Sequence, residues 1–527
     1  MEKKRTKRAL PYLLLGAILT SLTLIFPQLG FLEWFTLIPL FIGAYRFCGS
    51  SKHGLWCTYW VGFLTIYVYY FFVYHWFINL YPLDFIGMDN ASSLAVVLAG
   101  WLGLSLLQAI PGGLIFLVFK LLHRTNLFYR APLLRPFVFS ALWVVFEWSS
   151  TLGWTGVPWG RLCLGQSEYL PILQASSLFG SYVVSFLLLL FNGLLAYAIL
   201  YHKRRAKAVL CVALALCLFI SNLVLGFALI QKTDGERESV KVAAIQGNVD
   251  MHETGTVLAN VMAVYGEMTR EAAAEGAELI VWPETAFPYR LNNSGMMKNY
   301  VSSLAQECDV TLIVGALYED DEERVYNAVY MVSPDGVISD TVYAKRHLVP
   351  FGEYVPMREL IMTLIPPLAN LSSLNSDLSP GEGSALFESE WGKLGSLLCF
   401  DTIYEELTLE SVRDGAVLMM LPSNDSWWFS DSAATYQQEA QAMLRAIENG
   451  RYLVRSGNTG ISSVMDEHGK HLSMLKPMVE GIAYGEVELC TELTLYTKIG
   501  NLFVYLCIAF IIMLFPIGIV LPRKRRF

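Results

Sequence analysis

The chain contains little charge for its length. Only 16% of its 527 residues are Asp, Glu, Lys or Arg, against about 25% in soluble domains, and 54% are hydrophobic. This composition is typical of a membrane protein and argues against a wholly soluble one. No basic stripe lies outside the two chain ends, and the net charge is −8. We therefore predict no nucleic-acid partner.

Cysteine is also scarce. The nine cysteines are scattered, and none forms the CxxC pair of a common metal site, so we predict no metal, no cofactor and no disulfide framework. Several lie inside apolar runs, where a cysteine is usually a small buried hydrophobe. The sequence leaves open whether Cys308 and Cys490 are paired. No internal repeat or low-complexity stretch is present.

Apolar runs are abundant in contrast. A bilayer is crossed by about 20 consecutive apolar residues in a helix. The runs lie at 9–26, 31–45, 55–80, 91–122, 132–148, 173–201, 208–230 and 502–521. They predict eight transmembrane helices, of which the second is the shortest. The fourth contains Pro111-Gly112-Gly113, so we expect it to kink or to re-enter the membrane.

The distribution of charge predicts the orientation. Both chain ends, MEKKRTKR and RKRRF, are basic, which places both in the cytoplasm and requires an even number of crossings. Lys and Arg also follow the second, fourth and sixth runs, whereas the opposite loops contain few. The long segment after the seventh run is therefore expected outside. We predict a membrane domain at 1–232, an extracytoplasmic domain at 233–498, and a last helix with a basic cytoplasmic tail at 499–527.

The segment 233–498 has an ordinary globular composition. Strand patterns and helical periodicities alternate along it, which indicates a layered α/β domain. The predicted strands are 240–246, 278–282, 311–316, 325–332, 337–343, 393–400 and 416–421, and the predicted helices are 254–275, 296–307, 402–413 and 435–449. Ser-Pro-Asp-Gly at 333–336 predicts a hairpin turn. The stretch 350–383 reads as a long apolar loop, a class that is often functional.

Three reactive residues lie at the ends of predicted strands of this domain: two directly follow a strand and the third closes one. They are Glu284 in Trp-Pro-Glu-Thr, Lys345 in Tyr-Ala-Lys-Arg, and Cys399 in Leu-Leu-Cys-Phe-Asp. The ends of strands are where α/β sheets present reactive groups. A thiol near its usual pKa of about 8.5 needs a base, which a carboxylate can supply. A lysine could stabilise an oxyanion. Taken singly, each residue is more simply a buried cysteine or a solvated loop residue.

The longer motifs around these residues favour a catalytic site over a buried cysteine and two solvated loop residues. The stretches are VWPETAFP (281–288), AKRHLVPFGEYVP (344–356), LGSLLCFDTIYEE (394–406), LPSNDSWWF (421–429) and RAIENGRYLVRSGNTGIS (445–462). They resemble the nitrilase superfamily, with its carbon-nitrogen hydrolase-like domain and its Glu, Lys, Cys triad in that order. With EWSSTLGWTGVPWG (147–160) upstream, the whole chain resembles the apolipoprotein N-acyltransferase family, which has eight spans and a catalytic domain before the last.

The resemblance implies specific roles. Glu284 matches the general base, Lys345 the triad lysine and Cys399 the nucleophile, while Glu353 matches a second glutamate that complements the lysine. The fold implied for this domain is an αββα sandwich. The supporting and substrate-contacting residues implied are Phe400, whose N–H is an oxyanion donor, Asp401, and Trp427 and Trp428 in a lipid-contacting arm. The tryptophans could equally be anchors at the bilayer interface. The family often has glutamate at the position of Asp401.

The resemblance also implies the reaction. A phospholipid acyl chain passes to Cys399 as a thioester, and then to the α-amino group of the diacylglyceryl-cysteine of a bacterial apolipoprotein. The enzyme is expected to be a monomer, embedded by several spans in the bacterial cytoplasmic (inner) membrane. The main alternative is a membrane-tethered amidase that uses the same triad with water as acceptor. A scaffold with a relict fold and a transporter are weaker alternatives, because the triad is complete and the spans contain few ionisable residues.

Overall fold

The computed structural model describes residues 9–83, 88–153, 156–231, 237–249, 257–364, 377–428 and 432–521. The chain divides into two compact units. Unit 1 comprises Met1–Ile78, Ala95–Lys232 and Ile499–Phe527, and unit 2 comprises Asn79–Leu94 and Thr233–Lys498. Both basic chain ends, on which the predicted orientation partly depends, lie outside the described residues.

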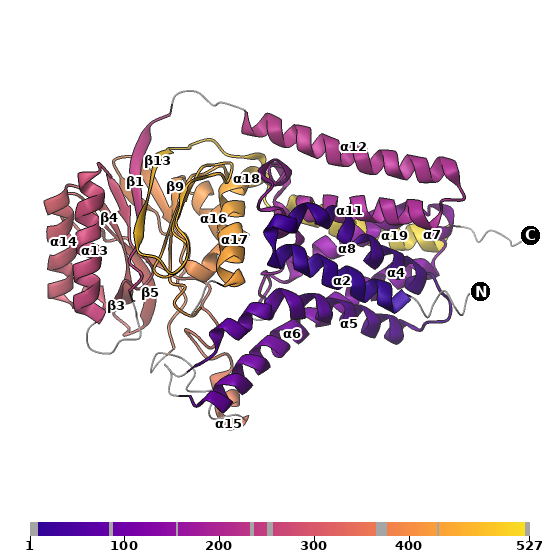
Figure 1. Cartoon of the computed structure of the whole chain (residues 1–527), viewed down its shortest axis with the longest axis horizontal. Coiled ribbons are helices and arrows are strands. Elements are labelled where there is room, and N and C mark those ends of the chain that lie inside the picture. The colour runs from indigo at the N-terminus through magenta and orange to yellow at the C-terminus, as the bar shows by residue number, and fades with distance from the viewer. Residues whose placement is uncertain are drawn as a thin grey trace, which may run out of the picture. The chain divides into compact units, whose positions relative to one another are not determined.

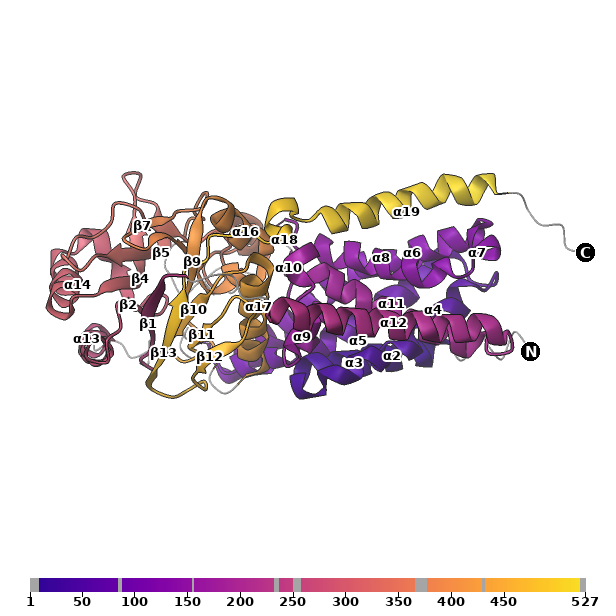
Figure 2. The same cartoon turned by 90° about the horizontal axis from the view of Figure 1, so that it is seen from above.

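Unit 1 is built from helices. They are α2 (Ala9–Ile25), η1 (Pro27–Leu32), α3 (Glu33–Thr36), α4 (Ile38–Cys48), α5 (Leu55–Val73), η2 (Tyr74–Leu80), α6 (Asn90–Arg124), α7 (Leu127–Arg130), α8 (Leu134–Ser149), η4 (Leu162–Gln166), α9 (Leu170–Leu173), α10 (Ser176–Phe179), α11 (Ser181–Leu200), α12 (Arg205–Ile230) and α19 (Leu502–Val520). Helix α11 packs against α4, α8 and α12, and α2 packs against α4 and α5. Figure 2 shows α19 running alongside α8.

All eight predicted runs contain helix, but not all are long enough to span a bilayer by themselves. Within the described residues, six helical stretches are long and apolar enough: Pro27–Cys48, Leu55–Leu80, Asn90–Arg124, Ser181–Leu200, Arg205–Ile230 and Leu502–Val520. Helices α2 and α8 have 17 and 16 residues, short of the roughly 20 that a span needs. The presence of several membrane-compatible helices is therefore confirmed, and the count of eight crossings stays a prediction.

Two details differ from the predicted runs. The sixth run is divided, because Gly180 has a φ of 78° and separates α10 from α11. The fourth run is one continuous helix, α6, through Pro111. At Gly112 and Gly113 a Cβ atom would come within 2.6 Å of Ile66 and 2.7 Å of the Tyr59 ring. These glycines therefore allow α5 to approach α6 closely, as small residues do between membrane helices.

Unit 2 contains two sheets and the helices that cover them. The strands are β1 (Ser239–Gln246), β2 (Leu279–Val281), β3 (Phe287–Arg290), β4 (Thr311–Glu319), β5 (Val325–Val332), β6 (Tyr343–Ala344), β7 (Phe387–Ser389), β8 (Gly392–Ser396), β9 (Ala416–Ser423), β10 (Leu453–Gly457), β11 (Ser463–Met465), β12 (His471–Met474) and β13 (Gly481–Glu488). The helices are α13 (Val257–Ala274), η5 (Leu291–Asn293), α14 (Gly295–Cys308), α15 (Arg358–Leu364), η7 (Cys399–Ile403), α16 (Glu405–Arg413), α17 (Ala433–Asn449) and α18 (Leu495–Ile499).

The two sheets have mixed strand directions. The first has the order β13-β1-β2-β4-β5-β6, with β3 also paired to β4, and the second has the order β12-β11-β10-β9-β8-β7. Strand β2 runs parallel to β1 and β4, and β9 runs parallel to β8 and β10. Because the central strands of each sheet are parallel, their carboxyl ends lie at one edge of that sheet.

The alternation of side chains along β1 shows how the layers form. Val240, Val242 and Ala244 enter an apolar core shared with strands of the second sheet, whereas Ala243 and Ile245 enter a core shared with α13 and α14. This is the period of two expected for a strand that is covered on both faces. Figures 1 and 2 show α13 and α14 outside one sheet and α16 and α17 outside the other. The predicted αββα sandwich is therefore confirmed.

Several local predictions for unit 2 need correction. The hairpin turn forms, with Gly336 N–H donating to the Ser333 carbonyl, but the returning strand at 337–343 is reduced to β6 and one isolated bridge. The strand predicted at 393–400 ends at Ser396. The stretch 350–383 contains a short helix, α15, and its residues 365–376 lie outside the described residues. The strands β3, β7 and β10–β13 were not predicted.

Candidate active site

Glu284 lies at the end of a short buried strand. Strand β2 (Leu-Ile-Val) ends at Val281, and Trp282-Pro283 carries the chain to Glu284. The carboxylate is almost completely buried and accepts hydrogen bonds at both oxygens. Its Oε1 accepts from Lys345 Nζ at 2.8 Å, and its Oε2 accepts from the Asn424 backbone N–H at 2.8 Å. Because Asn424 follows β9, the carboxylate links the ends of the two sheets.

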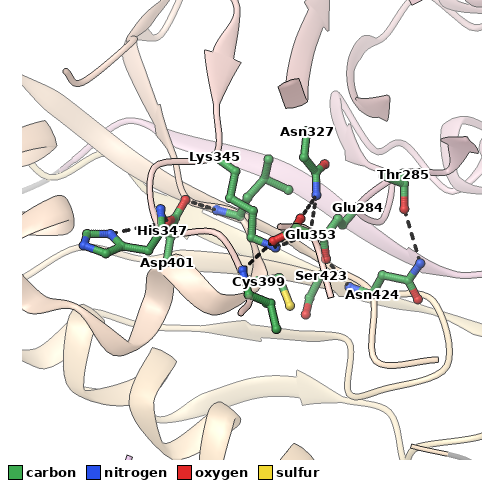
Figure 3. A network of polar contacts seen from close by, with 12 residues as sticks. Glu284, Thr285, Asn327, Lys345, His347, Glu353, Cys399, Asp401, Ser423 and Asn424 are labelled. Atoms are coloured by element: carbon green, nitrogen blue, oxygen red, sulfur yellow. Dashed lines mark hydrogen bonds and ion pairs between the residues drawn. The ribbon is translucent and has the colours of Figure 1, made fainter. Parts of the chain in front are cut away.

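Lys345 follows β6 and is 1% exposed. Its ammonium lies between two carboxylates, 2.8 Å from Glu284 Oε1 and 3.0 Å from Glu353 Oε1. Glu353 is itself held by the Val349 N–H, which donates to its Oε2 at 2.8 Å. A buried ammonium is stable when opposite charges and hydrogen bonds surround it, and this arrangement supplies both. Figure 3 shows the lysine reaching between the two acids.

Asn327 belongs to the same cluster and was not predicted from the sequence. It lies on β5 and is 3% exposed. Its Nδ2 amide donates to Glu284 Oε1 at 2.7 Å and to Glu353 Oε1 at 2.8 Å. The amide therefore spaces the two carboxylates, which would otherwise repel each other. Its only signal in the sequence is a polar side chain in the middle of an otherwise apolar strand, Val-Tyr-Asn-Ala-Val-Tyr.

Cys399 does not end a strand, because two residues separate it from β8 and it begins the 3-10 turn η7. Its φ of 45° lies in the left-handed region. For a residue with a side chain this conformation costs about 1–3 kcal/mol and is found mostly at functional sites. The thiol lies beside Ser423 and the Glu284–Lys345 pair (Figure 3).

Asp401 fixes the turn that carries Cys399. It is fully buried and accepts from the Tyr343 hydroxyl at 2.8 Å and from the His347 N–H at 2.8 Å. The Leu398 N–H also donates to it, at 3.4 Å. Tyr343 and His347 flank Lys345 in sequence, so one carboxylate ties the lysine segment to the cysteine turn. The shorter aspartate at this position therefore makes defined contacts in this chain.

The electrostatics suit transfer of the thiol proton to Glu284 during reaction. Burial, together with the neighbouring Glu284 carboxylate, raises the pKa of Cys399 to about 12, so the resting cysteine is a thiol. Burial also raises the pKa of Glu284, against the opposing effect of Lys345 and with a further contribution from Glu353. Although burial alone lowers the pKa of Lys345, Glu284 and Glu353 raise it well above its usual value. The lysine is therefore permanently charged.

The remaining predicted residues have defined places but no tested roles. Phe400 follows Cys399 in η7, and its ring packs edge-on against Tyr404. Trp427 and Trp428 are half-buried in the turn after β9, and the next residues, 429–431, lie outside the described residues. Cys308 and Cys490 are both free thiols, which answers the question of their pairing.

Comparison with known proteins matches both parts of the chain. The carbon-nitrogen hydrolase family model matches residues 241–492, and the model of the apolipoprotein N-acyltransferase N-terminal domain matches residues 16–194. Among solved structures, a carbon-nitrogen hydrolase from Helicobacter pylori is 17% identical, covers 55% of this chain and 96% of its own, and has a TM-score of 0.37.

Curated relatives extend over most of the chain. The apolipoprotein N-acyltransferase of Geobacter metallireducens is 35% identical over 70% of this chain and 72% of its own length. That of Gloeobacter violaceus is 29% identical over 93% of this chain and 90% of its own length. The extent of these matches, over a helical unit and an αββα domain that brings together Glu, Lys and Cys, shows that the chain belongs to the apolipoprotein N-acyltransferase family.

Proposed function

We propose that this membrane enzyme transfers an acyl chain through a thioester on Cys399, from a membrane phospholipid to the α-amino group of the diacylglyceryl-cysteine of an apolipoprotein. Glu284 is the general base, and Lys345 with the Phe400 N–H stabilises the oxyanion. Glu353 holds the lysine, and Asp401 holds the cysteine turn. The observation that carries the proposal is the buried Glu284–Lys345 ion pair, 2.8 Å long, beside the Cys399 thiol.

The first half-reaction forms the thioester. Glu284 accepts the thiol proton while the sulfur attacks the ester carbonyl carbon of the phospholipid. Negative charge develops on the carbonyl oxygen, next to the permanently charged Lys345. The C–S bond forms, the ester C–O bond breaks, and the proton on Glu284 passes to the departing lysophospholipid oxygen. The raised pKa of Glu284 suits a group that must both accept and return a proton.

The second half-reaction transfers the acyl group. The α-amino group attacks the thioester carbonyl and loses a proton to Glu284, an amide C–N bond forms, and the C–S bond breaks. The sulfur leaves as a thiolate and recovers its proton from Glu284. Water must be excluded during this interval, because it would hydrolyse the thioester. The apolar loop around α15 and the Trp427–Trp428 turn are the proposed lipid-contacting arms.

The proposed placement follows from where the substrates are found. Both are membrane lipids, so we propose the catalytic domain 233–498 on the extracytoplasmic face of the inner membrane. In the sequence, this domain follows the membrane domain, 1–232, and precedes the last helix with its tail, 499–527. Both chain ends are proposed to be cytoplasmic, and the enzyme to act as a monomer with eight crossings. The predominance of Lys and Arg in alternate loops supports this orientation.

A two-stage labelling experiment tests the reaction. The purified full chain is incubated with phospholipid labelled in its acyl chain, and label on Cys399 that hydroxylamine releases is measured by mass spectrometry. A diacylated lipopeptide is then added. We expect the label to move to the lipopeptide amine. Label that never reaches Cys399 would refute the thioester, and label that passes only to water would favour the hydrolase alternative.

Cysteine accessibility tests the orientation. Asp335, in the turn after β5, and Lys203, between α11 and α12, are exposed positions on opposite predicted sides. In intact spheroplasts a membrane-impermeant thiol reagent should label Asp335→Cys, and it should label Lys203→Cys only after permeabilisation. The reverse pattern would invert the proposed orientation. The parent chain supplies the background labelling of its own nine cysteines.

A further inference from the structure

A glutamine outside the proposed triad contacts the sulfur of the proposed nucleophile. Gln438 lies on α17, which packs against η7, the turn that begins at Cys399. Its Nε2 amide lies 3.5 Å from Cys399 Sγ, within hydrogen-bond range for sulfur. The side chain is 3% exposed, so water does not compete freely for this contact. The contact joins residues 39 positions apart in the chain.

The orientation of this amide is fixed by a buried arginine. Arg455, on β10, donates from Nη2 to Gln438 Oε1 at 3.1 Å. A guanidinium has donors and no acceptor, so only the oxygen of the amide can face it. The –NH₂ group must therefore face Cys399. An amide that could flip would present either group to the sulfur, but here the flipped orientation would place two donors together.

The arginine is itself held rigidly. Arg455 is fully buried and donates to Asp425 Oδ2 at 3.0 Å and to Glu439 Oε2 at 2.8 Å. Glu439 also accepts from His471 Nε2 at 2.8 Å. Although burial alone raises the pKa of Glu439, these contacts lower it to about 2, so it stays ionised. Arg455 and Glu439 are therefore a charged support behind Gln438, and Asp425 is a further acceptor for the arginine.

This geometry determines the direction of the thiol hydrogen. Since the Gln438 –NH₂ can only donate, the sulfur must accept from it. The S–H bond is then free to point at the Glu284 carboxylate, which lies beside the thiol (Figure 3). When that proton leaves, the sulfur becomes an anion and the N–H···S contact becomes charge-assisted. Hydrogen bonds to an ion are about twice as strong as those between neutral groups.

We propose that Gln438 is a further catalytic residue, whose amide N–H aims the Cys399 thiol at Glu284 and stabilises the thiolate sulfur in both half-reactions, with Arg455 as the residue that positions it. No bond forms or breaks at Gln438, and the proton and acyl group move as described above. The inference deepens the proposed function and rests on it for the two half-reactions. The contact between amide and sulfur can be tested without turnover.

The test compares Gln438→Leu and Gln438→Glu in the full chain. The first removes the donor, and the second removes it while keeping an oxygen that can accept from Arg455, in case the leucine variant fails to fold. Gln306→Leu is the control, because Gln306 is an exposed amide on α14. Both Gln438 variants should form and discharge the thioester about 10- to 100-fold more slowly, the effect of losing a hydrogen bond to a charged group. The control should keep the parent rates.

A second readout separates a chemical role from a structural one. Alkylation of Cys399 by iodoacetamide at pH 9, followed by mass spectrometry, reports its thiolate fraction, with Cys308 in the same chain as the reference. In the Gln438 variants, Cys399 should be alkylated about tenfold more slowly than in the parent, whereas Cys308 should be alkylated at the parent rate. Arg455→Lys should also slow the alkylation of Cys399, by a smaller factor, because a lysine cannot make the forked contacts of the arginine.

The outcomes separate the two proposals. Parent rates of acyl transfer and of alkylation in both Gln438 variants would overturn the role of Gln438 while leaving the thioester mechanism intact. Slower alkylation of Cys399 in the variants, combined with no acyl label on Cys399 of the parent, would retain the amide–sulfur contact and reject the thioester. A fall in thermal stability with unchanged alkylation per folded molecule would show that Gln438 is structural only.

Discussion

Lys345 Nζ lies 2.8 Å from Glu284 Oε1, and the two side chains are only 2% and 6% exposed. This is a buried ion pair whose members come from different strand ends. Removing one partner of such a pair leaves an uncompensated buried charge, which costs about 3–5 kcal/mol. Here the loss is compounded, because Lys345 also neutralises Glu353. The lysine therefore stabilises the folded domain and, by proposal, the transition state.

Lys345→Met should be inactive and less stable, by about 3–5 kcal/mol near neutral pH. The two carboxylates left behind would repel each other, and the folded state would then hold a proton that the unfolded chain releases. A folded state that binds more protons gains stability as pH falls. The melting temperature of the variant, relative to that of the parent, should therefore rise as the pH is lowered from 8 to 5. Differential scanning fluorimetry over that range measures it.

Lys393→Met is the matched control. Lys393 is 45% exposed and lies 3.8 Å from Glu388, which is 77% exposed. Exposed pairs contribute about 0–1 kcal/mol, so this variant should keep its activity and its pH dependence of melting. Equal losses of activity and of melting temperature in Lys345→Met and Lys393→Met would contradict the importance given to the buried pair.

The proposed base predicts a shift of the pH profile. Glu284 must be ionised to accept the thiol proton, so activity should fall as pH drops through its pKa, which burial and then Glu353 raise. Glu353→Gln removes the nearby negative charge and should lower the pKa of Glu284. The acid limb of kcat/KM should then move to lower pH, whatever happens to the maximum rate. Glu388→Gln, at an exposed position, should leave the limb in place, and an unmoved limb in Glu353→Gln would mean that another group titrates.

Asn327 is predicted to be essential through charge rather than size. Asn327→Asp replaces the donor between Glu284 and Glu353 with a third acceptor, so it should abolish thioester formation and lower the melting temperature. Asn327→Leu loses two hydrogen bonds to charged groups, each worth about 1.5–3 kcal/mol, and should also be strongly impaired. Asn293→Asp, at an exposed position of η5, should behave like the parent. Thioester yield and melting temperature measure both effects. Full activity of Asn327→Asp would remove the asparagine from the site.

The parts of unit 2 that the sequence predicted are those with strong local signals. Strands β1, β2, β4, β5 and β9 are apolar runs, and α13 carries Val257, Val261, Tyr265 and Met268 on one buried face. Glu284 could be recognised because it follows such a strand, β2, whereas Lys345 follows only the two-residue β6 and was recognised from its motif, AKRHLVPFGEYVP. Strand β10 was missed because it includes Arg455, a fully buried charge. No local pattern reveals the partners that Arg455 finds in Asp425 and Glu439.

The rest of the site could not be predicted because it depends on contacts between distant segments. The donor on Asn327 meets Glu284 across 43 positions of the chain, and Gln438 meets Cys399 across 39. A single polar residue in a strand or helix has no partner until the fold is complete. The turn at Cys399 is of the same kind, since its positive φ is maintained by contacts such as Leu398 N–H to Asp401 rather than by a glycine.

Tyr343→Phe tests whether Asp401 holds the cysteine turn. The substitution removes the hydroxyl that donates to Asp401 Oδ2 at 2.8 Å, in a side chain that is 2% exposed. Weakening a buried carboxylate contact costs about 1.5–3 kcal/mol. We expect a matching loss of unfolding free energy and a lower rate of thioester formation at saturating phospholipid, because Cys399 is held less firmly.

Tyr326→Phe gives the comparison, since the Tyr326 hydroxyl also donates to an aspartate, Asp320, at 3.0 Å. The Asp320 side chain is 16% exposed and keeps its contacts with Arg324, so water and the arginine can replace the lost donor. That variant should lose less than about 1 kcal/mol and keep its acylation rate. If Tyr343→Phe lost stability but acylated Cys399 at the parent rate, Asp401 would stabilise the domain without positioning the nucleophile. The shorter aspartate at this position would then have no catalytic consequence.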